Sequence, residues 1–395
     1  MKFEGLLKVT FWKVVGVVLM AAALFAAVQR YAMGLGATTN LVDTFPWGLW
    51  IGFDILVGVG LAAGGFTIAA TVYVFNIERF RPILRPTILT AFLGYLLVIA
   101  GLMVDLGRPW AIWHAMIMWN PHSVMFEVAW CVMLYTTVLA LEFSPVVLER
   151  FKLKRALKVI KTITIPLVVL GVILSTLHQS SLGSLFLIIP GRMHPLWYSN
   201  VIPFLFIISC VAAGLAMTIV ESFLSSRAFG REVELPLLSD LARVMVVVLA
   251  LYGTVRIQDL MSRDALQYVF QPSYQSALFL GEVLVGVVLP FILLLSKKVR
   301  AHRTGLFYSA AMVIIGFVAH RLNTAITSME RWPDRIYVPT WQELAITLGL
   351  AAFGFMAFAF VARYFKVFGE EVHAHGAPAA AVEPSAGLPV PATAE

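Results

Sequence analysis

The sequence predicts an all-α protein that crosses a membrane about ten times. Of its 395 residues, 60% are hydrophobic and 13% are charged, whereas roughly 25% of a typical soluble domain is charged. The mean hydropathy is +0.87, and ten apolar segments are each long enough to cross a bilayer. Because a backbone in lipid must satisfy its own hydrogen bonds, we expect these segments to be helices.

The segments follow one another along almost the whole chain. Their expected limits are 11–30, 47–75, 86–106, 122–143, 159–178, 198–221, 237–261, 274–296, 304–322 and 341–363. The first follows Lys2, Lys8 and Lys13 and is similar to a signal peptide, but its apolar length favours a helix that is retained. The Ala/Pro-rich end, 373–395, has no apolar period and is expected to be disordered.

Basic residues distinguish the two sides of the membrane. With an even number of spans both chain ends share a side, and 19 basic residues of loops and ends fall there against 6 on the other side. The positive-inside rule therefore places both ends in the cytoplasm. The net charge of +7 then reflects basic loops and not a nucleic-acid partner. Cys131 and Cys210 lie in apolar segments, which argues against a disulfide framework or an Fe–S cluster.

The second span carries one carboxylate, Asp54, inside an apolar run. Asp54 follows Trp47 by seven residues, so it lies about 10 Å into the span by helical rise. A buried acid in a membrane is costly and is by default a functional-site hypothesis, with structural pairing as the alternative. Among the glycines of the same span, five favour close helix packing over ligand contact: Gly52, Gly58, Gly60, Gly64 and Gly65.

The next three spans also place ionisable groups in their outer halves. The third ends at Asp105, just before Arg108; the fourth reaches Glu127 after about one and a half turns. The fifth span ends at His178, and the polar residues QSS follow. Residues near helix ends can instead extend to water, so this cluster has a structural alternative.

Spans six to nine repeat the arrangement. Arg256 and Asp259 are three apart near the end of the seventh span, share a helix face and could pair. The eighth span carries Glu282, and the ninth ends with His320 and Arg321. A two-haem conduit needs axial ligands, usually His, at two depths. The spans offer His only at their outer edge, so we expect no such conduit and place any chemistry at the outer face.

Several motifs resemble the NrfD/polysulfide-reductase membrane-subunit family, and in particular the membrane subunit of hydrogenase-2-type complexes. The motifs are FPWGLWIGFD, AGG of the second span, VYVFN, RPTILTAFLGY, DLGRPW, NPHSVMFE, ALEFSPVVLER, LHQSSLGSL, HPLW and PTWQELAITLG. The resemblance covers about residues 41 to 363. It implies a fold of two four-helix bundles, formed by spans two to five and six to nine, with the first and last spans peripheral.

The resemblance also implies limits for the parts of the chain. These are a first helix in 1–40, a first bundle with a quinone site in 41–197, a second bundle in 198–322, a last helix in 323–366 and a tail in 367–395. Such membrane proteins lie in a bacterial inner membrane and bind menaquinone or ubiquinone at the outer end of the first bundle, without haem or metal. A periplasmic ferredoxin-like Fe–S subunit exchanges electrons with the quinone, and a catalytic subunit, here expected to be a [NiFe] hydrogenase, lies beyond it.

Roles follow for the matching residues. His178 and Asp105 are expected to hydrogen-bond the quinone head, and carboxylates or imidazole near the ring can supply its protons. Glu127 and Asp54 are expected to relay protons or shape the pocket. Arg108 is expected to hold Asp105 ionised or to steer the partner. Trp47 and Trp50 are expected to line the entrance, with the aromatic belt of the membrane interface as the alternative. Proton movement through the second bundle would use Arg256, Asp259, Glu282 and Arg321.

Three further interpretations stay open at this point. The same quinone-anchor role fits a sulfur-compound, nitrite or multihaem-cytochrome complex, and the direction of electron flow is open with it. A secondary transporter or ion pump fits the buried acids and two similar halves, although its charges are expected near the midplane. The third interpretation is a purely structural anchor without quinone. Substituting Asp105 or His178 separates these, because only a quinone site would assemble and lose turnover.

Overall fold

In the residues that it describes, the structure confirms an all-α protein with ten helices long and apolar enough to cross a membrane. It is a computed structural model that describes residues 10–45, 47–330 and 336–368. Within those ranges the chain has no β-strand, only an isolated bridge between Val42 and Phe45. Lys2, Lys8 and the predicted disordered end at 373–395 lie outside the described residues.

Eight spans are single helices and two are interrupted. The single helices are α2 (Phe11–Met33), α6 (Arg81–Asp105), α8 (Val124–Arg150), α9 (Lys154–Ser184), α10 (Ile202–Phe229), α11 (Leu235–Ser262), α16 (Arg303–Ala325) and α17 (Trp341–Tyr364). The second span comprises η1 (Trp50–Ile55), α4 (Leu56–Leu61) and α5 (Gly64–Tyr73), and the eighth comprises α13 (Tyr274–Val283), η5 (Leu284–Val288) and α14 (Leu289–Leu295). Short connecting helices include α3 (Leu35–Thr38), α7 (His114–Ile117), α12 (Leu266–Val269) and α15 (Lys297–Arg300).

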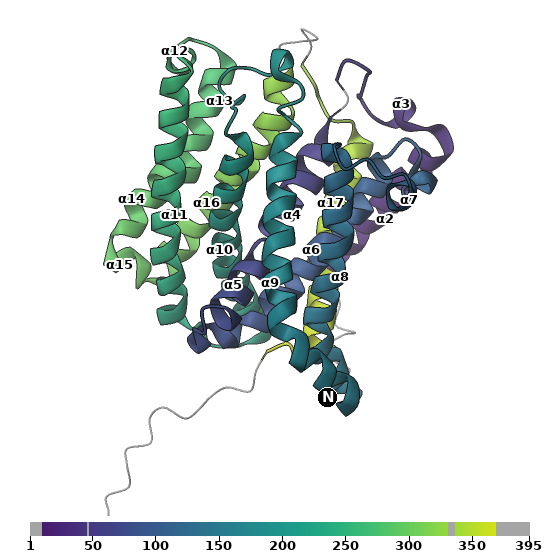
Figure 1. Ribbon diagram of the computed structural model, residues 1–395, viewed down its shortest axis with the longest axis vertical. Helices are drawn as coiled ribbons and strands as arrows, with labels where there is room; N and C mark the ends of the chain where they lie inside the picture. Colours follow the sequence, from purple (N-terminus) through teal and green to yellow (C-terminus); the bar gives the residue numbers. More distant parts are fainter. Residues whose placement is uncertain (1–9, 46, 331–335, 369–395) are drawn as a thin grey trace, which may run out of the picture.

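The helices contact one another in two groups. The second span, α6, α8 and α9 pack together, and so do α10, α11, the eighth span and α16. Contacts of α10 with α4, α5 and α9, and of α16 with η1, join the groups. Helices α2 and α17 lie along each other, and α17 also packs on α6, as Figure 1 shows on one side of the molecule. The domain limits drawn from the sequence stay a prediction.

Two pairs of glycines let backbones meet between helices. A Cβ on Gly214 would lie 2.5 Å from the Gly64 nitrogen, and a Cβ on Gly316 would lie 2.0 Å from the Gly286 Cα. The first pair joins the two groups of helices, and the second holds the eighth span against α16. Small residues at such crossings are typical of membrane helix packing.

Both interrupted spans contain a π-helical turn beside a buried acid. Asp54 lies within η1, and Glu282 comes two residues before η5. A π-helical turn inserts an extra residue into the helix, changes the direction of the side chains around it and is frequent at functional sites. The sequence pattern places these acids in apolar runs but does not predict the irregular turns.

Candidate functional site

His178 lies inside the first group of helices and is completely buried. The sequence-based limit ended the fifth span at His178, but α9 continues for six residues to Ser184, so this limit was wrong. The helix continues because the polar residues after His178 are buried as well and keep helical hydrogen bonds. The His178 Nδ1 atom is 2.9 Å from the Tyr95 hydroxyl of α6.

Several polar atoms around His178 have no hydrogen-bond partner among the described residues. They are His178 Nε2 and both amide atoms of the neighbouring Gln179. Tyr135 of α8 lies close by, next to Ser175. The Tyr135 ring stands edge-on to Tyr95 with centroids 4.7 Å apart. A buried polar atom without a partner costs about 1–3 kcal/mol and calls for an explanation such as water or a ligand. When the Tyr95 hydroxyl donates to Nδ1, the neutral His178 ring has its proton on Nε2 and can donate to an acceptor.

Asp54 faces the last span and not His178. Its Oδ2 accepts a hydrogen bond of 2.8 Å from the Thr347 hydroxyl of α17. A Cβ on Gly101 of α6 would lie 2.9 Å from the Asp54 Cβ, so the acid occupies the place that a side chain there would fill. Asp54 itself is 9% exposed. The last span, expected to be peripheral, therefore supplies a polar contact to a predicted site residue.

Arg30, and not Arg108, is the cation beside Asp105. Arg30 of α2 is 3% exposed and donates from Nε to the Val104 carbonyl at 2.6 Å and from its terminal nitrogen to the Leu106 carbonyl at 2.5 Å. Its charge acts on Asp105 at the end of α6. Arg108 is exposed, and no ion pair joins it to Asp105 among the described residues. The expectation that Arg108 holds Asp105 ionised was wrong, because α6 ends at Asp105 and Arg108, three residues later, is exposed.

The predicted quinone-binding residues thus fall into two separate places. Tyr95, which contacts His178, and Gly101, which contacts Asp54, are six positions apart on α6. Six positions place them about 120° apart around a helix. His178 therefore lies among α6, α8 and α9, whereas Asp54 and Asp105 lie between α6 and the pair formed by α2 and α17.

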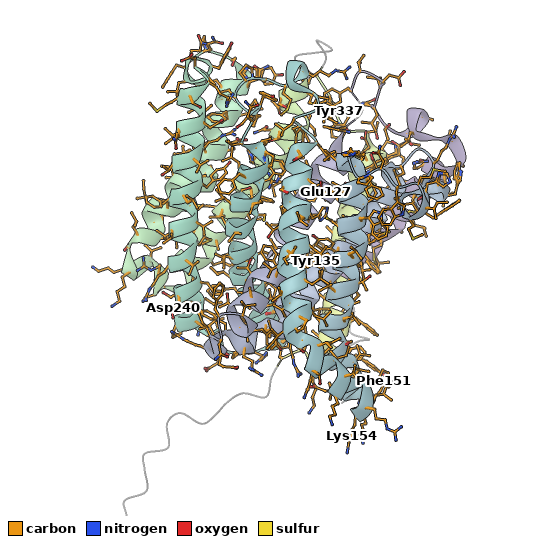
Figure 2. The ribbon with its side chains drawn as sticks, in the orientation of Figure 1. Glu127, Tyr135, Phe151, Lys154, Asp240 and Tyr337 are labelled. Atoms are coloured by element: carbon orange, nitrogen blue, oxygen red, sulfur yellow. The ribbon has the colours of Figure 1, made fainter. Side chains whose placement is uncertain are left out.

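Glu127 and Trp47 occupy further positions toward the end of the molecule at which Tyr337 lies. Glu127 is half-buried in the first turn of α8, and its carboxylate has no ion pair among the described residues. Figure 2 shows Glu127 nearer than Tyr135 to the end of the molecule at which Tyr337 lies. Trp47 is half-buried and meets Phe186 edge-on, with ring centroids 5.4 Å apart.

Tyr337, in the segment before α17, holds the start of the second span in place. It donates to the Glu343 carboxylate and accepts from the Leu49 N–H at 3.0 Å. Burial, followed by the hydrogen bond to Glu343, raises the pKa of Tyr337 above its ordinary value, which keeps the phenol protonated. Glu343 also accepts from the Thr340 N–H at 2.8 Å in a capping box at the start of α17. These bonds anchor the chain just before Asp54.

Glu282 is surrounded by donors in the second group of helices. It accepts from Trp197 Nε1 at 3.0 Å, from Asn323 Nδ2 at 2.6 Å and lies 3.2 Å from His320 Nδ1. Glu282 and His320 line a cavity of ≈ 30 Å³. Since a water needs roughly 10–15 Å³ by this measure, the cavity has room for one or two waters. The His320 Nε2 atom has no partner among the described residues.

Arg256 and Asp259 do not pair as the sequence suggested. Asp259 forms an ion pair with Arg263 at 2.6 Å and accepts from the Ser199 hydroxyl at 2.6 Å. Arg256 donates instead to the Leu196 carbonyl at 2.8 Å. The prediction was wrong because Arg263, assigned to a loop, caps α11 one turn after Asp259. Arg321 donates to the Ser209 hydroxyl at 3.0 Å and lies over the Phe206 ring.

One buried acid was missed by the sequence analysis. Glu221 of α10 is 7% exposed, and its carboxylate lies next to Ser225, one turn later on the same helix. It lines a cavity of ≈ 10 Å³ with Thr87, Thr90 and Thr218. The expected sixth span ended at this residue, which made Glu221 look like an end residue, whereas α10 continues to Phe229. The Glu142 Oε2 atom of α8 is without a partner in the described part of the chain.

Metal-ligating side chains do not gather in the described part of the chain. No group of three or more His, Cys, Asp and Glu side chains there could hold a metal ion. Cys131 and Cys210 are free and buried. The place around His178 and the place around Asp54 and Asp105 therefore offer hydrogen-bond donors and carboxylates as their chemistry.

Comparison with known proteins gives matches over most of the chain. The family model described as polysulphide reductase, NrfD matches residues 37–333. The probable Ni/Fe-hydrogenase 2 b-type cytochrome subunit of Escherichia coli is 34% identical over 88% of this chain and 90% of that protein. The menaquinone reductase integral membrane subunit of Nitratidesulfovibrio vulgaris is 29% identical over 93% of this chain and 94% of its own length. A selenate reductase subunit of Mesobacillus selenatarsenatis is 23% identical over 86% of this chain and 90% of its own.

Proposed function

Because the chain belongs to the polysulphide reductase NrfD family, we propose that it is the membrane subunit of a respiratory complex that exchanges electrons with quinone. It lies in a bacterial inner membrane with both ends in the cytoplasm. Its partner at the periplasmic face is a ferredoxin-like Fe–S subunit, and the catalytic subunit beyond it is a [NiFe] hydrogenase. Oxidation of hydrogen would then reduce menaquinone or ubiquinone. The hydrogenase assignment is supported by the name of the Escherichia coli relative, and the quinone by that of the menaquinone reductase subunit.

The single observation that supports a quinone site in this chain is the unpaired His178 Nε2 atom. A quinone head presents two carbonyl oxygens and, on reduction, takes up two protons with two electrons. His178 and the Gln179 amide, which also has no partner among the described residues, are the side chains that fit a carbonyl oxygen. His178 is 0% exposed, so a ring reaches it only after neighbouring side chains move.

In this proposal the carboxylates hold and move protons. Asp54 and Asp105 are turned toward α2 and α17, so they hold protons beside the ring site and do not contact the ring from the side of His178. Glu127, half-buried at the start of α8, lies at the outer end where protons enter or leave. The proposal gives the second bundle's Glu282, next to a cavity with room for water, a role in proton movement with Arg256, Asp259 and Arg321.

The alternatives to this proposal differ in the catalytic partner subunit and in the cofactors that this chain holds. A selenate reductase subunit is among the relatives, so a different catalytic subunit on the same membrane subunit is the second candidate. We assign no haem and no metal to this chain, although the Escherichia coli relative is named a b-type cytochrome subunit. Without a redox group of its own, the chain would be inactive alone.

The first experiment is purification of the intact complex in mild detergent, with metal, haem and quinone analysis. Nickel with Fe–S iron and bound quinone would support the hydrogenase complex, and molybdenum or selenium would support another reductase. Haem that stays with this chain would contradict the cofactor assignment. A chain isolated without quinone or redox partner would contradict the function and favour a transporter.

A matched pair of histidine variants tests the site. His178→Gln should lower quinone-linked turnover by at least tenfold, equivalent to about 1.4 kcal/mol, while reduction of a dye by the partner subunits continues. His302→Gln, at an exposed residue before α16, should leave both rates unchanged. Normal quinone turnover in an assembled His178→Gln complex would place the ring elsewhere.

A further inference from the structure

Three lysines of α9 line one hollow on the surface of the protein. Lys154, Lys158 and Lys161 surround it together with Leu157 and Thr162, and its volume is ≈ 370 Å³. The lysines follow one another at intervals of four and three residues, which puts all three on the same face of the helix. The hollow is therefore bounded by three ammonium groups and an apolar side chain.

The three ammonium groups have no acidic partner among the described residues. The sequence from residue 150 to residue 220 contains no Asp or Glu. Glu149, the acid that precedes this stretch, already pairs with Arg85 at 2.9 Å. Other basic residues of this end are also paired within the protein, such as Arg79 with Asp240. A counter-charge for the lysines must therefore come from outside the described part of the chain.

The hollow lies where α9 enters the membrane. Lys161 is seven positions after Lys154 and so about 10 Å further along the helix, inside the span Lys154–Ser184. Apolar neighbours face outward: Val159 is 60% and Ile165 57% exposed. This surface therefore meets lipid, where an unpaired charge is costly and a lysine extends its ammonium toward the headgroups.

The adjoining turn between α8 and α9 also has the character of a membrane interface. Phe151 is 59% and Leu153 53% exposed, beside the exposed Lys154. Figure 2 shows Phe151 and Lys154 together at the end of the molecule opposite Tyr337, and Figure 1 shows the ends of α8 and α9 projecting there. Large apolar side chains interleaved with lysines are typical of segments that lie among lipid headgroups.

From these observations we propose that the Lys154–Lys158–Lys161 hollow binds the phosphate-bearing headgroup of an anionic phospholipid. The ammonium groups meet the phosphodiester, and Leu157 contacts the start of an acyl chain. Basic pockets at the cytoplasmic surface of membrane proteins suit such headgroups, and the proposed orientation puts this hollow there. A zwitterionic lipid is disfavoured because its own cation would face three lysines. The proposal is independent of the redox role.

The experiment compares lipid retention by matched triple variants of the full chain. Lys154→Gln/Lys158→Gln/Lys161→Gln removes three charges from the hollow. Lys297→Gln/Lys298→Gln/Arg303→Gln removes three exposed charges, two in α15 and one at the start of α16. Each protein is equilibrated in phosphatidylcholine nanodiscs that contain phosphatidylglycerol, extracted in mild detergent and measured by native mass spectrometry.

We expect the wild type and the control triple variant to retain phosphatidylglycerol, and retention by the hollow variant to fall at least tenfold. Equal retention by the hollow variant, or an equal loss from the control, would overturn the proposal. Displacement of the lipid by millimolar inorganic phosphate would show a site for free phosphate and would also overturn it. If the triple variant does not elute as a folded protein, Lys158→Gln is compared with Lys298→Gln by the same measure.

Discussion

Replacing Thr347 by valine is expected to destabilise the contact between α17 and the second span. The side chains have the same shape, so the change removes one hydroxyl and leaves the packing of α17 in place. That hydroxyl is the hydrogen-bond donor to Asp54 Oδ2, at 2.8 Å, and Asp54 is only 9% exposed. An unpaired buried acceptor costs about 1–3 kcal/mol. At roughly 2–4 °C per kcal/mol, the apparent Tm should fall by about 2–12 °C.

Thermal unfolding of the detergent-purified protein is measured as the fraction that still elutes as a single species after heating. Thr347→Ser keeps the hydroxyl and should cost only about 0.8 kcal/mol, the value of the one buried methyl group that it loses. In an Asp54→Ala background the Thr347→Val change should cost almost nothing, because the acceptor is gone; the difference between backgrounds is the coupling of the pair. A Thr347→Val effect that is the same size in both backgrounds would refute the reasoning.

Two other pairs of substitutions test the glycine contact between the eighth span and α16, and the hydrogen bonds that Arg30 donates to the end of α6. Gly316→Ala should destabilise by about 1–3 kcal/mol or more, because its Cβ would lie 2.0 Å from the Gly286 Cα, whereas Gly281→Ala, with nothing within 4 Å, should be tolerated; the yield of monodisperse protein measures both. Arg30→Met should lower the apparent Tm because it leaves two carbonyls at the end of α6 without their charged donor. The exposed Arg108→Met should stay within about 0.5 kcal/mol, and equal effects at the two arginines would contradict the assignment of Arg30.

The ten spans could be predicted because hydropathy and length are properties of single segments. The order of the ionisable groups along the spans follows in the same way, and Asp54 and Glu282 are buried as expected. Helix ends could not be predicted as well, since a helix continues beyond its apolar residues when serine hydroxyls bond to carbonyls of the preceding turn, as Ser181 does to Leu177 and Ser222 to Thr218. That is why α9 extends past His178 to Ser184 and α10 past Glu221 to Phe229.

Partners across helices depend on how helices rotate against one another, which a single sequence does not determine. Arg256 and Asp259 share a face, yet the nearer base for Asp259 is Arg263. Arg30 belongs to the first span, far from Asp105 in sequence, and no local pattern connects the two. Tyr95 gave no signal either, because a phenol in an apolar span looks like any aromatic side chain until His178 is found beside it.

Glu282 and His178 differ in their hydrogen bonding, although each group of helices has buried polar atoms without a partner among the described residues, such as Arg321 Nη1 in the second. Glu282 is contacted by donors from Trp197, Asn323 and His320, and the free ring nitrogen of His320 has a cavity with room for water beside it. A carboxylate bound in this way is held as an acceptor and gains little from a further ligand. His178 and Gln179 have three unpaired polar atoms between them, and each residue would gain a hydrogen bond from a carbonyl-bearing ring. We therefore predict that substitutions at Glu282 act first on stability. Substitutions at His178, where the quinone is proposed to bind, should act first on quinone turnover.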